Sequence, residues 1–141
     1  MKSIHILLVE DNDGDILLTT DTLEESNIIN TLTVIKDGRA AMDYFSNLVN
    51  KNEAPDLVLL DINLPKENGH KVLQYIKKDE FLRHIPVIML TTSSSEKDVL
   101  SAYKYYANGY ITKPVEITEF IAAITSIENF RFHIAPISTQ G

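Results

Sequence analysis

Short apolar runs alternate along the chain with segments whose apolar residues recur at helical spacing. The short runs are typical of buried strands, and the periodic segments are typical of amphipathic helices. Strands are predicted at about residues 4–10, 31–36, 57–61, 86–90 and 110–112. Helices are predicted at about residues 14–26, 40–48, 69–77, 95–107 and 117–127.

Five strand–helix units in succession predict an α/β fold, with a doubly wound, five-stranded parallel sheet and helices on both faces. The run at residues 57–61 is apolar up to its last residue, Asp61, as expected for a strand covered on both faces. Ligands bind such sheets beyond the carboxyl ends of the strands. Residues 1–128 are expected to form this domain, and residues 129–141 a C-terminal tail.

Side chains suited to chemistry follow the predicted strands. Glu10 and Asp11 follow the first, Asp61 ends the third, and Thr91 and Lys113 follow the fourth and fifth. If the first and third strands are neighbours, three carboxylates converge and repel one another unless a cation lies between them. An oxygen-only site of this kind suits magnesium. A carboxylate, a divalent ion, a hydroxyl and a lysine are the parts required to transfer a phosphoryl group to an aspartate.

Composition and charge exclude several other classes. A net charge of -7 with scattered basic residues speaks against a nucleic-acid surface. The absence of cysteine excludes disulfides, thiolate catalysis and Cys-ligated zinc. The N-terminal apolar run is too short for a secretory signal, and no stretch is long enough to span a bilayer. We therefore expect a cytoplasmic protein without nucleic-acid or membrane partners.

Four motifs resemble those of receiver domains in two-component response regulators. They are LVED at residues 8–11, LLDINLP at 59–65 followed by Gly69, PVIMLT at 86–91 and YITKP at 110–114. Each motif is weak alone, but four in this order, each at a predicted strand end, form a specific resemblance over roughly residues 4 to 128. The resemblance implies the flavodoxin-like receiver fold and a phosphoprotein that acts in phosphorelay signal transduction.

The chain is most similar to the stand-alone receivers that are paired with phytochrome-type sensor histidine kinases. That likeness is carried by EDN at residues 10–12 with Asp15, NLPK at 63–66, RHIP at 83–86, LTTS at 90–93 and IENF at 127–130. It implies a phytochrome-like histidine kinase as the partner that supplies the phosphoryl group.

The resemblance also implies which residues form the phosphorylation site. Asp61 would be the phosphoacceptor. Glu10, Asp11 and Asp61 would hold Mg²⁺ together with the backbone carbonyl of Asn63. Many receivers carry aspartate at the position of Glu10, and the longer Glu10 side chain is expected to reach the metal through water.

Three further residues would bind the phosphoryl group or respond to it. Thr91 would bind a phosphoryl oxygen, and Lys113 would pair with Asp61 or with the phosphoryl group. Tyr110 would swing inward when Thr91 moves. The bond between Lys113 and Pro114 matches a position that is commonly cis in the family.

The output is expected to pass through protein contacts, either to a downstream partner or to a phosphotransfer protein. We expect no DNA-binding domain after residue 127. The alternating Phe130, Phe132 and Ile134 have no core of their own to join, and we predict a homodimer formed through the last helix and the tail.

Two alternative functions follow from the same residues. An aspartate-nucleophile phosphatase of the haloacid dehalogenase type would need a second acid two residues after Asp61, and that position holds Asn63. The second alternative is a dimerisation module that works without phosphorylation and whose acid site is vestigial. The complete set of acids, together with Thr91 and Lys113, argues against it.

Overall fold

The computed structural model describes residues 4–27, 30–92 and 103–126. The strands are β1 (Ile4–Val9), β2 (Asn30–Ile35), β3 (Leu57–Asp61), β4 (Val87–Thr91) and β5 (Gly109–Thr112). The helices are α1 (Asp13–Glu25), α2 (Gly38–Ser46), α3 (Gly69–Lys78) and α5 (Ile117–Thr125), with the 3-10 turns η1 (Lys51–Glu53) and η2 (Leu82–His84). Within these described ranges, no helix is long and apolar enough to cross a membrane.

The observed elements confirm the predicted strands and four of the predicted helices, with ends that differ by a few residues. Most of the helix predicted at residues 95–107 lies outside the described residues, and residues 103–104 of it are helical. The two 3-10 turns were not predicted. Each is only one turn long, too short to produce a periodic apolar pattern.

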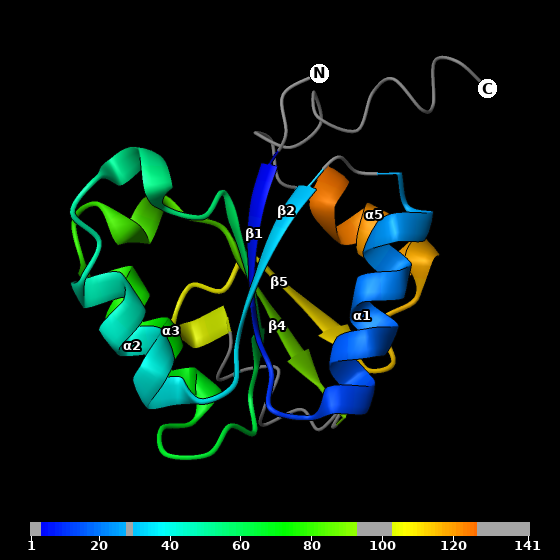
Figure 1. Cartoon of the computed structure of the whole chain (residues 1–141), viewed down its shortest axis with the longest axis horizontal. Coiled ribbons are helices and arrows are strands. Elements are labelled where there is room, and N and C mark those ends of the chain that lie inside the picture. The colour runs from blue at the N-terminus through cyan, green and yellow to red at the C-terminus, as the bar shows by residue number, and fades with distance from the viewer. Residues whose placement is uncertain (1–3, 28–29, 93–102, 127–141) are drawn as a thin grey trace.

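The strands form one parallel sheet in the order β2-β1-β3-β4-β5. Helices α1 and α5 cover one face of the sheet, and α2 and α3 cover the other (Figure 1). The predicted doubly wound α/β fold is therefore confirmed. Since β1 lies between β2 and β3, the strand order reverses beside β1, where doubly wound sheets place their ligand sites.

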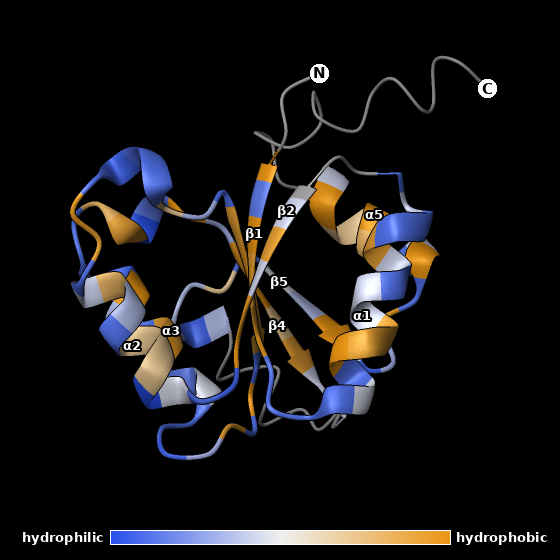
Figure 2. Cartoon of the chain, in the orientation of Figure 1, coloured by the Kyte–Doolittle hydropathy of each residue, from blue (hydrophilic) through white to orange (hydrophobic). Residues whose placement is uncertain are grey.

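Alternate residues of the central strands supply two separate cores. Leu7 and Val9 of β1 pack on the side of α2 and α3, whereas Ile6 and Leu8 pack on the side of α1 and α5. Figure 2 shows the apolar residues concentrated in the strands, with polar residues on the outer surfaces of the helices. This burial on both faces explains why the central strands read as continuous apolar runs.

Short polar residues begin three of the helices at the carboxyl edge of the sheet. Asn12, Asp37 and Asn68 each accept a hydrogen bond from a backbone N–H in the first turn of the helix that follows. These bonds satisfy donors that have no partner within the helix. The caps therefore hold the starts of α1, α2 and α3 beside the ends of the strands.

Gly69 allows α3 to begin directly against the end of β3. Its backbone N–H donates a 2.7 Å hydrogen bond to the carbonyl of Ile62. A Cβ atom at this position would lie 2.1 Å from the backbone oxygen of Asp61, closer than any real contact. A glycine is therefore required for α3 and Asp61 to keep their relative positions.

We expect Gly69→Ala to lower the free energy of unfolding by about 2–3 kcal/mol, because the added methyl group must displace backbone. Urea denaturation measures the change. Gly109→Ala is the matched control, since a Cβ there meets Ile88 Cγ1 at an ordinary 3.4 Å. Equal effects of the two substitutions would contradict the close approach at Gly69.

Candidate phosphorylation site

The carboxyl ends of β1, β3 and β5 bring charged side chains from distant parts of the sequence together. Asp61 is the last residue of β3, Glu10 directly follows β1, and Lys113 directly follows β5. The parallel pairing of Val9 with Leu60 places Glu10 and Asp61 side by side. The predicted convergence of these residues at one sheet edge is confirmed.

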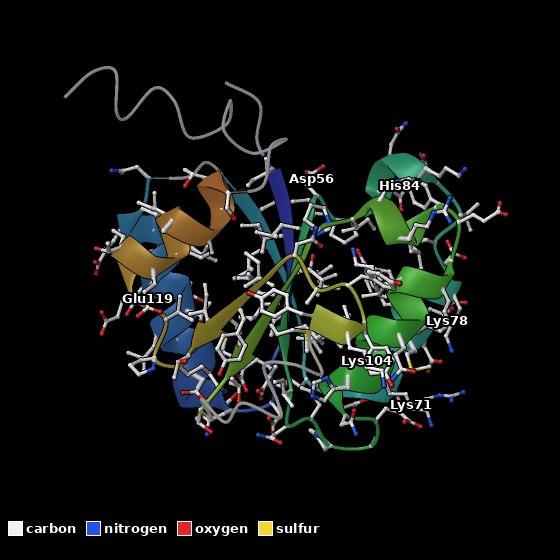
Figure 3. The ribbon with its side chains drawn as sticks, turned by 180° about the vertical axis from the view of Figure 1, so that it is seen from behind. Asp56, Lys71, Lys78, His84, Lys104 and Glu119 are labelled. Carbon is white, nitrogen blue, oxygen red and sulfur yellow. The ribbon has the colours of Figure 1, made fainter. Side chains whose placement is uncertain are left out.

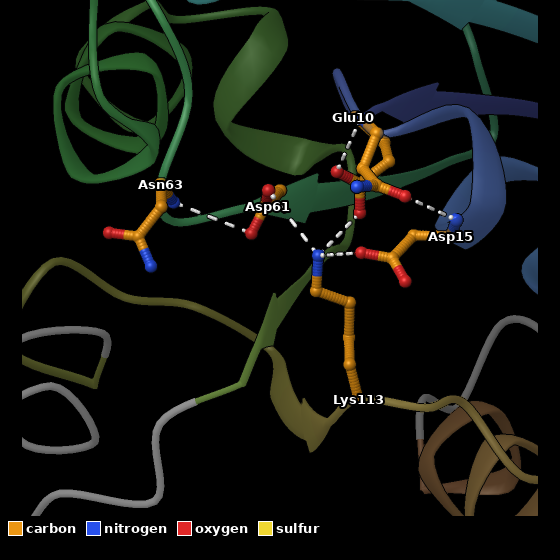
Figure 4. Close-up of polar contacts among 6 residues, drawn as sticks. Glu10, Asp15, Asp61, Asn63 and Lys113 are labelled. Carbon is orange, nitrogen blue, oxygen red and sulfur yellow. Dashed lines mark hydrogen bonds and ion pairs between the residues drawn. The ribbon is translucent and has the colours of Figure 1, made fainter.

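A single ammonium group contacts three carboxylates at this edge (Figure 4). Lys113 Nζ lies 2.6 Å from Glu10 Oε1, 2.9 Å from Asp15 Oδ2 and 3.5 Å from Asp61 Oδ2. The side chains of Lys113, Glu10 and Asp61 are 7%, 0% and 4% exposed, so little water screens these contacts. Removing one partner from such a buried set leaves uncompensated charge.

Burial shapes the protonation of this cluster. Burial raises the pKa of Glu10 to about 7; the hydrogen bond from Lys113 opposes this rise, and the charge of Asp61 adds to it. Burial alone would lower the pKa of Lys113, but its hydrogen bonds with Glu10 and Asp15 and the charge of Asp61 outweigh burial and raise it. Lys113 is therefore fully charged at neutral pH, whereas Glu10 is close to its titration point.

Three carboxylates fit a divalent cation. Glu10, Asp11 and Asp61 each offer an oxygen atom, and these atoms lie within 4.8 Å of one another. Asp11 is exposed, so the cluster is open to solvent on that side. Carboxylate oxygens with access to water are the ligands that Mg²⁺ and similar hard ions prefer.

The other predicted site residues lie at different depths around the cluster. Thr91 is fully buried at the end of β4, and its carbonyl accepts a 2.6 Å hydrogen bond from the backbone N–H of Lys113. Asn63 is exposed, and its backbone N–H donates to Asp61 Oδ1 at 3.4 Å. Tyr110 is half-buried within β5, opposite Met89 and three residues before Lys113. Thr91 and Asn63 thus border the acids, whereas Tyr110 lies further from the edge.

Asp15 is the residue of this cluster that the sequence did not assign to it. It lies in the first turn of α1, where an acid is stabilised by the helix dipole, and its backbone N–H donates to the Asn12 cap. Its carboxylate also forms a 2.9 Å ion pair with Lys113. The sequence signal that could have placed Asp15 in the cluster was its position three residues after the helix cap Asn12, which turns its side chain towards the strand ends.

The Lys113–Pro114 peptide bond is cis, as the resemblance implied.

Known proteins carry the same sequence features. Residues 6–125 match the family described as the response regulator receiver domain. The response regulator Rcp1 of Synechocystis sp. is 39% identical over 127 residues, which cover 89% of this chain and 86% of Rcp1.

Two solved structures show the same fold. The phosphorylated cyanobacterial phytochrome response regulator RcpA is 39% identical, with a TM-score of 0.74, and the match covers 92% of this chain and 94% of RcpA. The Mn²⁺-bound form of Rcp1 is 38% identical, with a TM-score of 0.72 and coverages of 91% and 94%.

The raised pKa of Glu10 predicts that the wild type and Glu10→Gln differ in their free energy of unfolding, and that this difference changes with pH. A glutamate whose pKa is higher in the folded state stabilises the fold below its ordinary pKa of 4.5, and this contribution is lost as the pH rises through about 7. From pH 4.5 to 8, the free energy of unfolding should therefore shift in favour of Glu10→Gln by on the order of 3 kcal/mol. Urea denaturation in EDTA measures this difference, and a pH-independent difference would contradict the burial effect.

Lys113→Met should lower the free energy of unfolding by about 3–5 kcal/mol, because buried carboxylates lose their only cationic partner among the described residues. Lys36→Met is the matched control, since Lys36 and its partner Asp13 are both exposed. Its effect should stay below about 1 kcal/mol. Denaturation of both variants at neutral pH compares them, and equal losses would refute a special role of the Lys113 contacts.

Proposed function

The chain belongs to the response regulator receiver domain family, and we propose that Asp61 is its phosphoacceptor, with a histidine kinase as the phosphoryl donor. Receiver domains are signalling proteins that work with histidine kinases, and phosphorylation on an aspartate is typical of the family. The observation that carries the proposal is the position of Asp61, which ends β3 beside two further acids and Lys113.

The proposed reaction is a direct phosphoryl transfer. A carboxylate oxygen of Asp61 attacks the phosphorus atom of a phosphohistidine, forming a P–O bond as the P–N bond breaks. The electron pair of the broken bond returns to the imidazole nitrogen of the kinase. Lys113 Nζ, 3.5 Å from Asp61 Oδ2, is close enough to pair with the negative charge of the transferred group.

Magnesium is the proposed cofactor. Glu10, Asp11 and Asp61 would hold it with the backbone carbonyl of Asn63, and the ion would offset charge on the phosphoryl oxygens. The Mn²⁺-bound form of Rcp1 supports a divalent ion in a similar protein. The contact between Glu10 and Lys113 supports the expectation that Glu10 acts on the metal through water, since Lys113 already occupies Glu10 Oε1.

The proposed switch joins the site to the last strand. Thr91 would bind the phosphoryl group through its hydroxyl, and Tyr110 would change position with it. The backbone bond from Lys113 to Thr91 supports this coupling, because it ties the two strand ends together. Phosphorylation would then alter the surface formed by β5 and α5 for a downstream protein or a phosphotransfer partner.

The partner proposals rest on similarity to phytochrome response regulators. RcpA is described as such a regulator, which supports a phytochrome-like sensor kinase as the partner of this chain. Homodimerisation through α5 and the tail stays a prediction, because residues 127–141 lie outside the described residues. Cytoplasmic localisation likewise stays a prediction.

Phosphatase activity on external phosphoesters is disfavoured by Asn63. An aspartyl-phosphatase needs an acid two residues after its nucleophile to protonate the leaving group. The Asn63 amide has no such proton to supply. The only catalysis that we propose for the chain is its own phosphorylation and dephosphorylation.

Incubation with Mg²⁺ and acetyl phosphate, followed by intact-mass spectrometry, tests the proposal. The wild type should gain one phosphoryl group, and Asp61→Asn should gain none because its amide is not a nucleophile. EDTA should abolish labelling. Asp43→Asn is the control, since Asp43 is an exposed carboxylate on α2 that pairs with Arg39, and this variant should label normally. Undiminished labelling of Asp61→Asn would refute the proposal.

A further inference from the structure

A group of basic residues without carboxylate partners lies on the side of the molecule formed by α3, η2 and the residues before β5. We call these residues the basic patch: Lys77, Lys78, Arg83, His84 and Lys104. Figure 3 shows Lys78, His84 and Lys104 on the same side of the molecule, with Glu119 on the opposite side. In a chain of net charge -7, such a concentration of positive charge calls for a physical reason.

Most of the other lysine and arginine side chains in the described part of the chain have a carboxylate partner. Five of them have a carboxylate oxygen within 3.9 Å: Lys36, Arg39, Lys66, Lys71 and Lys113. A sixth, Lys51, lies over the ring of Phe81, as Lys104 of the patch lies over the ring of Tyr105. None of the described patch residues forms an ion pair with another described residue, so the patch charge is available to an external anion.

Lys77 is the most buried member of the patch, and neutral atoms surround its charge. Its Nζ atom donates hydrogen bonds to the carbonyl oxygens of Arg83 at 3.0 Å and Ile85 at 2.8 Å, and to Asn108 Oδ1 at 3.1 Å. Burial lowers the pKa of Lys77 to about 8. A nearby anion would offset the cost of keeping this ammonium charged.

Two adjacent hollows open beside Lys77. The larger, of about 420 Å³, is lined by Lys77, Arg83, His84, Tyr106 and Asn108. The smaller, of about 90 Å³, is lined by Gln74, Lys77, Lys78, Tyr105 and Tyr106. The two share Lys77 and Tyr106, so one extended ligand can enter both. The aromatic rings and the aliphatic lysine stems give the smaller hollow an apolar lining.

Tyr106 stands between the hollows in a costly conformation. Its φ of 68° lies in the left-handed region, which bulky residues rarely adopt, and its surface is 76% exposed. Because its side chain is exposed, packing in the core does not explain this conformation of Tyr106. Tyrosine and arginine are the residue types that most often anchor protein partners.

We propose that the basic patch docks an acidic segment of a partner protein that carries an apolar side chain. The apolar side chain enters the smaller hollow, against Tyr105 and Tyr106. Flanking carboxylates face Arg83 and His84 around the larger one, and the charge of Lys77, whose three N–H donors are bonded within the chain, adds to the attraction. The patch residues of α3 and η2 lie at the C-terminal end of α3 and before β4, at the sheet edge opposite Asp61. The inference therefore stands independently of the proposed phosphorylation.

Fluorescence anisotropy at low ionic strength tests the docking with a defined probe, a short fluorescein-labelled peptide in which glutamates flank a central leucine. We expect saturable binding that weakens with added salt. Arg83→Glu and Lys78→Glu should each weaken it by about tenfold, since a reversed charge repels the peptide. Arg39→Glu on α2 makes the same change in net charge outside the patch and should have less than about a twofold effect. A peptide with glutamine for glutamate should not bind.

Several outcomes would overturn the proposal. One is the absence of saturable binding to the wild type, and another is an equal loss in Arg39→Glu. Tighter binding of a single-stranded oligonucleotide would instead assign the patch to nucleic acid. Salt-sensitive self-association in sedimentation, abolished by Arg83→Glu, would make the acidic face of a second copy the occupant. Labelling of Asp61 in Arg83→Glu should be normal, which separates failure of this inference from failure of the phosphorylation proposal.

Discussion

The ammonium group of Lys113 is the interaction on which the candidate site depends. Glu10 and Asp61 are both almost fully buried, and two adjacent carboxylates without a cation would repel one another or take up a proton. The contacts of Lys113 with both acids and with Asp15 connect the ends of β1, β3 and β5 with the start of α1. A change in the charge of Asp61 therefore acts, through Lys113, on Glu10 after β1, on Asp15 in α1 and on the end of β5.

The parallel sheet makes this arrangement possible. Because β1 and β3 are adjacent and run in the same direction, residues 10 and 61 meet although they are far apart in the sequence. The asparagine and aspartate caps fix the starts of the helices at the same edge, and Gly69 lets α3 begin against the backbone of Asp61. Buried apolar strands thus provide the rigid support that a loop-borne acid cluster would lack.

The sequence predicted the strands, the sheet edge and most of the candidate site because each depends on local pattern. The alternation of strand-like and helix-like segments defines where each strand ends, and the strand ends place Glu10, Asp61, Thr91 and Lys113 at one edge of the sheet. It did not predict that Asp15 pairs with Lys113 or that Glu10 titrates near neutrality, because both depend on side-chain direction and on depth of burial. The basic patch was hidden for the same reason, because along the sequence its residues are only part of a scattered set of basic residues.

The two ends of the sheet differ in how their charges are balanced. At the carboxyl edge, Lys113 forms ion pairs with three acids. At the opposite edge, Lys77 is held by neutral oxygens, and neither Lys78 nor Arg83 forms an ion pair with another residue that the structure describes. Asn108 accepts from Lys77 and also from the backbone N–H of Val87, at the start of β4, and β5 begins one residue later. The strands β4 and β5, which end at Thr91 and Thr112, therefore begin beside Lys77 of the basic patch.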